Sequence, residues 1–459
     1  MYFEQVYDKT LAQASYFIGC QAKKEAIVID AKRDIDTYLE IAKANNMRIT
    51  HIAETHIHAD FLAGTRELAA ATGASMYLSD EGGSDWQYEF DHVGLKEGSQ
   101  IKVGNLTLDI IHTPGHTPES ISFLLTDHPA SDKPVILLSG DFVFVGDVGR
   151  PDLLEEAAGI EGSKELGAQQ LFDSLEKFKS LPDYVQVWPG HGAGSACGKA
   201  LGAVASTTVG YEKIRNWALQ FGDDFESFKN ELLKDQPEAP YYFGKMKKLN
   251  KVNRTLLIDV PSHPIISVDQ IDSNAFIIDT RNKFEFAKGH LKKSVNIQNN
   301  NSLATWAGWL VSYDQPIVIV ADDSNMDIIT RKLMRIGLDN IQGFITDFST
   351  KDFSEYTTII DIEQVEDFLK DPEVVLLDVR NSKEFAEGHI SGATSHFVGK
   401  LAKVLPEIGK DKAIVIQCQS GDRASIANSF LAANGYNNLY SYNGSMQDWL
   451  ANNRKVVKS

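Results

Sequence analysis

Runs of apolar residues alternate with amphipathic stretches in the second half of the chain. VVLLDV at 374–379 is continuously apolar, as is typical of a strand that is buried on both faces of a sheet. ASIANSFLAANG at 424–435 has helical apolar spacing and ends in Asn434-Gly435, which is a good helix stop. Strands and helices that alternate in this way predict α/β domains with parallel sheets.

An internal repeat divides this half in two. IIDTRNKFEFAKGHL, 277–291, returns as LLDVRNSKEFAEGHI at 376–390, which is 99 residues later. Each copy is followed by an apolar strand, IVIVAD in the first and AIVIQC in the second. A period near 100 residues is too long for a solenoid unit, so it indicates tandem homologous domains. A polar stretch at 346–358 separates the copies. We predict domains at 262–350 and 357–459.

The first part of the chain has a different pattern and forms a third predicted domain, 1–255. IKVGNLTLDIIHTPGH, 101–116, carries strand and hairpin signals. LAGTRELAAATG, 62–73, is a helical stretch. This mixture predicts sheets covered by helices.

Composition narrows the class of protein. The 459 residues carry a net charge of −18, with 43% hydrophobic and 24% charged residues, which is ordinary globular composition. So acidic a chain is not expected to bind nucleic acid or an anionic membrane through a broad basic face. No apolar run approaches the length of a membrane span, and the N-terminus shows no signal-peptide pattern. Three Cys are too few for a disulfide framework, so we expect a reducing compartment, the cytoplasm.

Polar clusters follow four strand-like runs of the first domain. ITHIAET leads into the first cluster, LTLDIIHTPG into the second, VILLSG into the third and YVQVWPG into the fourth. The residues are His56, His58 and Asp60, then His116, Asp141 and His191. Each alone is compatible with a structural role. In a packed sheet, however, such strand ends can converge at one edge, and His56 and His58 can face one site because residues i and i+2 of an extended segment point the same way. Imidazole and carboxylate donors together predict a Zn or Fe site.

The motifs THIHAD, TPGHT, SGD and PGH, in this order, resemble the metallo-β-lactamase fold. This resemblance implies an αββα domain. The usual first motif ends in a His that serves a second metal, and Phe61 stands there in this sequence. A phenyl ring cannot bind metal, so the sequence favours one metal with open coordination positions. Two His and one carboxylate suit a non-haem Fe(II) oxygenase.

The segment FVFVGDVGRPDL narrows the resemblance to the persulfide dioxygenases. Their iron ligands correspond to His56, His116 and Asp141, and their substrate-side arginine corresponds to Arg150. The resemblance further implies that three residues orient the ligands or contact substrate: His58, Asp60 and His191.

The residues after His191 depart from glutathione-thioester hydrolases, in which an acidic residue and a Tyr often follow. Small residues lead here to Cys197, six positions on. We expect a catalytic or sulfur-carrying role for Cys197; a small buried thiol is the alternative.

A second candidate nucleophile, Cys418, opens the loop CQSGDR between a strand and a helix. The backbone N–H groups of such a loop, the helix N-terminus and Arg423 all favour a thiolate and hold an anion. That thiolate can attack sulfane sulfur and hold it as a persulfide. The loop resembles that of rhodaneses, with DVRNSKEFAEGHI upstream and YNGSMQDW downstream. A loop of six residues suits small sulfur anions in that family, whereas the corresponding loop of related phosphatases has seven residues. The resemblance makes Cys418 and Arg423 catalytic and assigns substrate binding to the loop residues Gln419, Ser420, Gly421 and Asp422.

The middle copy lacks this chemistry. Asp322 stands at the position of the cysteine, Asp327 at that of the arginine, and Asp323 adds a third acid. We predict a fold without activity, which serves as a spacer, an interface or a docking surface.

The whole chain resembles the sulfide-detoxifying fusions of a persulfide dioxygenase with tandem rhodanese domains, the CstB type. This resemblance implies one Fe(II) per chain, with Zn as the alternative. It implies that low-molecular-weight thiol persulfides and O2 give sulfite, and that sulfite removes sulfur from Cys418 as thiosulfate. We also expect a homo-oligomer. Two other hypotheses remain: a zinc thioester hydrolase of the glyoxalase II kind fused to a sulfurtransferase, and a persulfide sensor or sulfur-delivery module for a protein partner.

Overall fold

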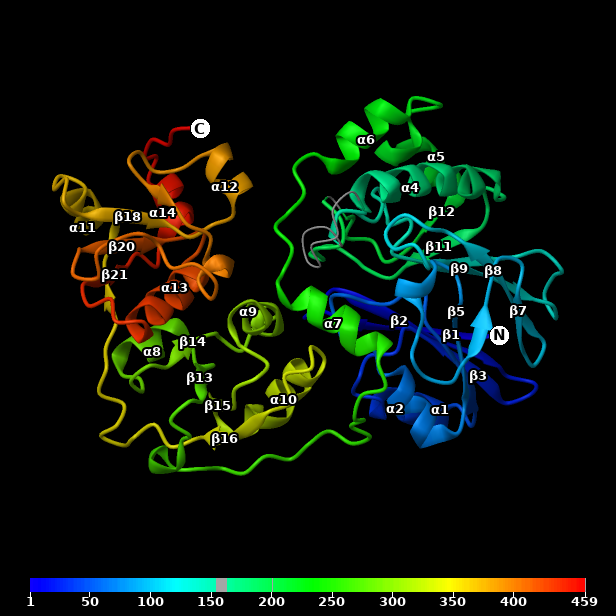
Figure 1. Cartoon of the computed structure of the whole chain (residues 1–459), viewed down its shortest axis with the longest axis horizontal. Coiled ribbons are helices and arrows are strands. Elements are labelled where there is room, and N and C mark those ends of the chain that lie inside the picture. The colour runs from blue at the N-terminus through cyan, green and yellow to red at the C-terminus, as the bar shows by residue number, and fades with distance from the viewer. Residues whose placement is uncertain (154–162, 200, 459) are drawn as a thin grey trace. The chain divides into compact units, whose positions relative to one another are not determined.

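A computed structural model describes residues 1–153, 163–199 and 201–458. The chain forms two compact units (Figure 1). The first consists of Met1–Val260 with Met334–Gly337, and the second of Pro261–Leu333 with Leu338–Ser459. None of the described helices is both long enough and apolar enough to cross a bilayer.

The first unit contains two six-stranded sheets. The first sheet has the order β1-β2-β3-β4-β5-β6, and its strands are Tyr2–Asp8, Gln13–Cys20, Glu25–Ile29, Arg48–Ala53, Ser75–Ser79 and Val93–Leu95. The second has the order β12-β11-β10-β9-β8-β7; from β7 to β12 its strands are Gln100–Val103, Leu106–His112, Ile121–Asp127, Ile136–Gly140, Gln186–Pro189 and Thr207–Thr208. The hairpin signal in 101–116 is confirmed, because β7 and β8 pair antiparallel.

Apolar packing holds these sheets face to face. Alternate residues of β2 and β3 pack against residues of β8, β9 and β10 in one buried cluster. Helices cover the outer faces: α1 and α2 pack on the first sheet, and α4 and α6 on the second. The helices are α1 Asp36–Ala44, α2 Thr65–Thr72, α4 Ser163–Ser180, α5 Val209–Arg215, α6 Phe225–Leu233 and α7 Tyr242–Lys251, with short 3-10 turns at Ser84–Trp86 and Trp217–Leu219. The unit is an αββα sandwich, as predicted.

The second unit contains two parallel sheets. The first, β14-β13-β15-β16, is formed by β13 Phe276–Asp279, β14 Val295–Asn296, β15 Ile317–Val320 and β16 Ile341–Ile345. The second, β17-β21-β20-β18-β19, is formed by β17 Thr358–Ile359, β18 Val375–Asp378, β19 Thr394–Ser395, β20 Ile414–Gln417 and β21 Leu439–Ser441. The order β19-β18-β20-β21 reproduces β14-β13-β15-β16, so the sequence repeat is also a repeat of topology.

Helices connect these strands. The first copy contains α8 Lys283–Lys288, α9 Leu303–Leu310 and α10 Met326–Met334; the second contains α11 Ile362–Phe368, α12 Ser382–Glu387, α13 Asp422–Ala433 and α14 Ser445–Ala451. Short 3-10 turns lie at Val268–Gln270, Asp323–Asn325 and Val398–Lys400. Parallel strands joined by helices confirm the α/β class. The exact domain limits 255, 262, 350 and 357 stay predictions.

Candidate metal centre and sulfur-transfer loop

Three predicted ligands of the first unit meet at buried strand ends. His56 follows β4, His116 lies between β8 and β9, and Asp141 follows β10. The Nε2 atoms of His56 and His116 lie 4.0 Å and 3.5 Å from Oδ2 of Asp141. One donor atom from each residue falls within 4.8 Å of the other two. The structure therefore brings together the three residues that the sequence predicted as iron ligands.

Three donor atoms of this cluster lack a hydrogen-bond partner in the part of the chain that the structure describes. Nε2 of His56 and both carboxylate oxygens of Asp141 are buried, and they have no hydrogen-bond partner among the described residues. Burying polar atoms without compensation is costly, and protein interiors rarely contain such groups. Two imidazole nitrogens and a carboxylate are a suitable donor set for iron or zinc. The residues present fit a metal ion.

Backbone and hydroxyl groups orient the imidazoles. Nδ1 of His116 donates to the carbonyl oxygen of Arg150 at 2.9 Å. The hydroxyl of Thr55 donates to Asp30, so its oxygen accepts from Nδ1 of His56 at 3.0 Å. Each ring thus carries its proton on Nδ1 and keeps a bare lone pair on Nε2, the form that binds metal. Burial lowers the pKa of both histidines, and it lowers that of His56 well below the usual range. Both rings therefore favour the neutral form.

His58 is turned away from this cluster. Its Nε2 lies 3.1 Å from Oδ1 of Asp30. Burial opposes the charged form, but the Asp30 carboxylate outweighs it and raises the pKa of His58 to about 9. Phe61 packs on the His58 ring, with centroids 4.3 Å apart. We interpret His58 as a residue that braces the segment carrying His56.

A second buried donor set lies next to the first. Asp60, His191 and Cys197 each place one donor atom within 4.8 Å of the others. Nε2 of His191 lies 3.2 Å from Asp60 and 3.5 Å from Asp141. Phe61 removes a histidine from the usual motif, yet these three residues supply other donors. Burial and the carboxylates of Asp141 and Asp60 raise the pKa of Cys197 well above its usual range, so its metal-free form is the thiol.

Arg150 is fully buried and braces the chain around Cys197. Its guanidinium forms an ion pair with Asp152, with the closest atoms 2.5 Å apart, and donates to the carbonyl of Pro237 at 2.6 Å. Its backbone N–H donates to the carbonyl of Cys197 at 3.1 Å. The substrate-binding role of Arg150 stays a prediction.

Asp30 is a site residue that sequence reasoning missed. Its carboxylate accepts from the backbone N–H of Thr55 at 2.7 Å, from the Thr55 hydroxyl and from His58. It connects the end of β3 to the segment that carries two predicted site histidines. The available signal was an Asp ending the apolar run EAIVID, the same position that Asp141 occupies after its own strand.

The predicted sulfur-transfer loop lies between β20 and α13. Cys418 is buried, and the N–H of Gly421 donates to its Sγ at 3.1 Å. Ser445 accepts from the Cys418 N–H at 3.0 Å. Gly421 has φ +91°, and a Cβ there would lie 2.4 Å from the carbonyl of Asn443. Only glycine fits this turn, which directs a backbone donor at the sulfur.

Arg423 is held in place by α12. Its two terminal nitrogens lie 2.6 Å and 2.7 Å from the carboxylate oxygens of Glu384. Burial works against the charge, but Glu384 outweighs it and raises the pKa of Arg423. The pairing fixes the orientation of the Arg423 guanidinium at the end of the cysteine loop.

Family models match both halves of the chain. The metallo-beta-lactamase superfamily matches residues 9–191, and the rhodanese-like domain matches 267–349 and 361–452. A solved metallo-beta-lactamase from Staphylococcus aureus subsp. aureus COL is 42% identical, has a TM-score of 0.69, and aligns over 98% of its own length and 75% of this chain. The chain belongs to the metallo-beta-lactamase superfamily. Its first unit carries that domain, and two rhodanese-like domains follow, so the predicted fusion is confirmed.

Two curated relatives resemble the metallo-beta-lactamase domain. A probable polyketide biosynthesis zinc-dependent hydrolase, BaeB, from Bacillus velezensis is 25% identical over 49% of this chain and 91% of its own length. The mitochondrial persulfide dioxygenase ETHE1 of Bos taurus is 26% identical over 41% of this chain and 66% of its own length. Relatives of one domain therefore include both a hydrolase and an oxygenase.

The two rhodanese-like domains share their internal bracing. Arg281 pairs with Asp279 and donates to the carbonyl of Gly289, and Arg380 pairs with Asp378 in the same way. Their loops differ, because the middle domain has an exposed Asp322 in place of the cysteine. Asp327, at the position of the loop arginine, pairs with Arg331 on its own helix at 2.8 Å.

We expect Asp322→Cys to leave the middle rhodanese-like domain without sulfur transfer. Asp327 still replaces the loop arginine, and the neighbouring Asp323 disfavours a thiolate. Thiosulfate-to-cyanide transfer is measured in a variant that also lacks Cys418, with Asp322→Ser in that background as the control. Transfer clearly above this control contradicts the prediction.

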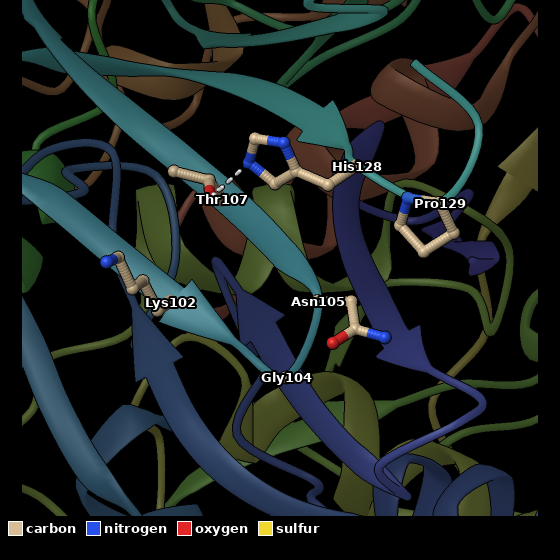
Figure 2. A pocket seen from close by; sticks show the side chains of 6 residues that line it. All are labelled: Lys102, Gly104, Asn105, Thr107, His128 and Pro129. Atoms are coloured by element: carbon tan, nitrogen blue, oxygen red, sulfur yellow. Dashed lines mark hydrogen bonds between the residues drawn. The ribbon is translucent and has the colours of Figure 1, made fainter. Parts of the chain in front are cut away.

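A cavity of about 450 Å³ lies elsewhere in the metallo-beta-lactamase domain, near the turn between β7 and β8 (Figure 2). It is lined by Lys102, Gly104, Asn105, Thr107, His128 and Pro129. Nε2 of His128 lies 2.9 Å from the hydroxyl of Thr107. None of the predicted site residues lines this cavity, so it does not belong to the metal centre.

Proposed function

We propose that this chain oxidises low-molecular-weight persulfides to sulfite at a single non-haem iron and transfers sulfane sulfur at Cys418, forming thiosulfate. The observation that carries the proposal is the buried donor set of His56, His116 and Asp141, in which His56 Nε2 and both Asp141 oxygens have no hydrogen-bond partner among the described residues, in a chain that also has a cysteine loop built around a backbone donor. The bovine persulfide dioxygenase supports the first activity, and the match to rhodanese-like domains supports the second.

His56, His116 and Asp141 would hold the metal. Iron there would supply the electron transfer to dioxygen that persulfide oxidation requires. The overall change consumes RSSH, O2 and water and yields RSH, sulfite and two protons. Two buried groups can accept such protons: the carboxylate of Asp60 and Nε2 of His191, which lie 3.2 Å apart. We propose that these groups and Cys197 contact the substrate side of the centre.

Sulfur transfer would use Cys418 as the nucleophile. Its thiolate attacks the outer sulfur of a second persulfide, the S–S bond breaks, and the carrier leaves with the electron pair as a thiolate, which then takes up a proton. Sulfite then attacks the outer sulfur of the cysteine persulfide, and thiosulfate departs while the Cys418 thiolate returns. The Gly421 N–H stabilises the sulfur anion, and Arg423 attracts sulfite. Because one chain holds both centres, tethering raises the effective concentration of sulfite near Cys418.

A zinc hydrolase is the second candidate function, and the zinc-dependent hydrolase from Bacillus velezensis favours it. The same donors suit zinc, and such an enzyme would cleave thioesters without consuming oxygen. A sensor or sulfur-delivery module is a third candidate. Turnover of Cys418 with thiosulfate or a persulfide and a small acceptor, with no protein partner present, would contradict that hypothesis.

We expect the purified chain to hold about one iron per chain and to take up oxygen with at least one member of a panel of thiol persulfides. Asp141→Asn should lose the iron, because a ligand is removed. Cys197→Ala should keep it, because Cys197 belongs to the second donor set. Metal analysis with an oxygen electrode measures both. Two tightly bound zinc ions per chain, with thioesterase activity and no oxygen uptake, would support the hydrolase instead.

A further inference from the structure

The middle domain contacts the cysteine loop of its neighbour directly. Nζ of Lys283, the first residue of α8, donates to the carbonyl of Ser420 and to a carboxylate oxygen of Asp422, both at 2.7 Å. The Lys283 side chain is 13% exposed, so the ammonium is held rather than free in solvent. Asn300 adds a longer contact to Asp422, at 3.4 Å.

The surrounding interface is specific and buried. The N–H of Asn296, on β14, donates to the hydroxyl of Ser429 at 2.9 Å, and its side chain accepts from Ser425 at 2.7 Å. Both serines lie on α13, the helix that begins at the cysteine loop, and Figure 1 shows α13 beside α8 and β14. Trp309 of α9 packs edge-on against Phe397, with ring centroids 5.3 Å apart. The middle domain is thus joined to the loop and to its helix by polar contacts that fix a register.

A single peptide group is hydrogen-bonded both to Lys283 and to the nucleophile. The peptide between Ser420 and Gly421 accepts from Lys283 through its carbonyl and donates to Sγ of Cys418 through its N–H at 3.1 Å. In a planar trans peptide these two groups point in opposite directions, so holding the carbonyl outward holds the N–H toward the sulfur. A cation on the carbonyl also polarises the N–H and strengthens its bond to a thiolate.

The glycine at position 421 makes the hydrogen bond from Lys283 to the Ser420 carbonyl necessary. A flip of the Ser420–Gly421 peptide changes ψ of the first residue and φ of the second, and glycine tolerates both signs of φ. The loop sequence alone therefore does not fix which way this peptide points.

We infer that Lys283 of the middle domain is a positioning residue for sulfur transfer, which acts on Cys418 by fixing the Ser420–Gly421 peptide. This inference rests on the proposed transfer at Cys418 and gives a task to a domain that has no nucleophile of its own. Lys283 touches no reacting atom; its effect passes through the backbone donor.

The test uses the full-length chain with Lys283→Met. The kcat for transfer of sulfane sulfur from thiosulfate should fall roughly tenfold, because the hydrogen bond from the Gly421 N–H to the Cys418 thiolate is weakened. KM should stay close to the parent value, because Lys283 does not bind the substrate. Lys283→Arg should restore most of the activity. Lys288→Met is the matched control: it changes a lysine of the same helix that is 71% exposed. Oxygen uptake should be unchanged in all three variants.

The peptide itself can be observed by NMR. Labelling serine carbonyl carbon and glycine nitrogen selects Ser–Gly peptides, and the sequence has three, ending at Gly140, Gly392 and Gly421. In Lys283→Met the Gly421 signal should shift or split, while the other two stay in place and report an intact fold. In Lys288→Met all three should stay.

An unmoved Gly421 signal in Lys283→Met overturns the inference, whatever the rate. So does a rise in KM at unchanged kcat, which would mean that Lys283 acts on substrate binding, directly or through Asp422. If the parent chain transfers no sulfur at Cys418, the proposed function fails, while the Gly421 signal still decides whether Lys283 fixes the peptide.

Discussion

Replacing Cys418 by serine should stop thiosulfate formation while oxygen uptake on a persulfide continues. The proposed iron donors lie in another domain, so the proposed oxidation step keeps all its residues. A hydroxyl is far less acidic than a thiol and cannot accept sulfane sulfur, so enzymatic transfer should fall by at least roughly a thousandfold, as expected when a covalent nucleophile is lost. Sulfite should accumulate where the parent chain makes thiosulfate. The measurement is product analysis that separates the two anions.

Sulfite also reacts slowly with persulfides without an enzyme, so the heat-inactivated chain supplies the background rate. Cys20→Ser is the matched control, because it removes another buried thiol outside both centres. If Cys418→Ser still forms thiosulfate at the parent rate above this background, transfer does not pass through Cys418. Cys197 would then be the leading candidate.

His116→Ala should abolish oxygen uptake and spare transfer at Cys418. Loss of a residue that hydrogen-bonds to a metal ligand lowers metal affinity or activity roughly ten- to a hundredfold, and loss of the ligand itself should lower them further. The variant should also lose iron, because His56 and Asp141 alone leave an incomplete donor set. Oxygen uptake, iron content and thiosulfate-to-cyanide transfer are measured on one preparation.

His128→Ala is the control for this experiment. His128 lies in the same domain but outside the metal centre, and it bonds to Thr107 and Asp132. We expect it to keep both activities. Parent-level oxygen uptake by His116→Ala would remove His116 from the ligand set, and loss of transfer together with oxygen uptake would contradict the independence of the two centres.

The sequence was a good guide wherever local pattern decides the structure. The helical stretch 62–73 contains α2, which ends at Gly73 in the left-handed region, and the apolar run 374–379 contains β18. The sequence predicted that the polar clusters would converge at one sheet edge, but in the structure they converge from two sheets: His56 follows β4 of the first sheet, whereas His116 and Asp141 follow β8 and β10 of the second. Strand ends and the resemblance in motif order selected His56, His116 and Asp141, but they did not show that the three residues come from two different sheets.

Contacts between distant segments were not predictable from one sequence. The spacing of His56 and His58 suggested that both face one site, but His58 turns to Asp30, which follows another strand, β3. Phe61 suggested a lost second metal position, and this stays a prediction; the second donor set of Asp60, His191 and Cys197 brings together residues that are distant in the sequence. Lys283 carried no signal, because its role depends on packing between two domains.

The braces shared by the two rhodanese-like domains bear on how such domains are diagnosed in other sequences. The Asp–Arg pair and the carbonyl it holds are the same in both copies, although only one copy has a cysteine. A search signature built on Asp378 and Arg380 would thus detect architecture and return false positives for enzymes. Cys418, Gly421 and Arg423 distinguish the copy that has the cysteine loop from the copy that lacks it. A genome survey that counts sulfurtransferases should therefore score the residues of the cysteine loop.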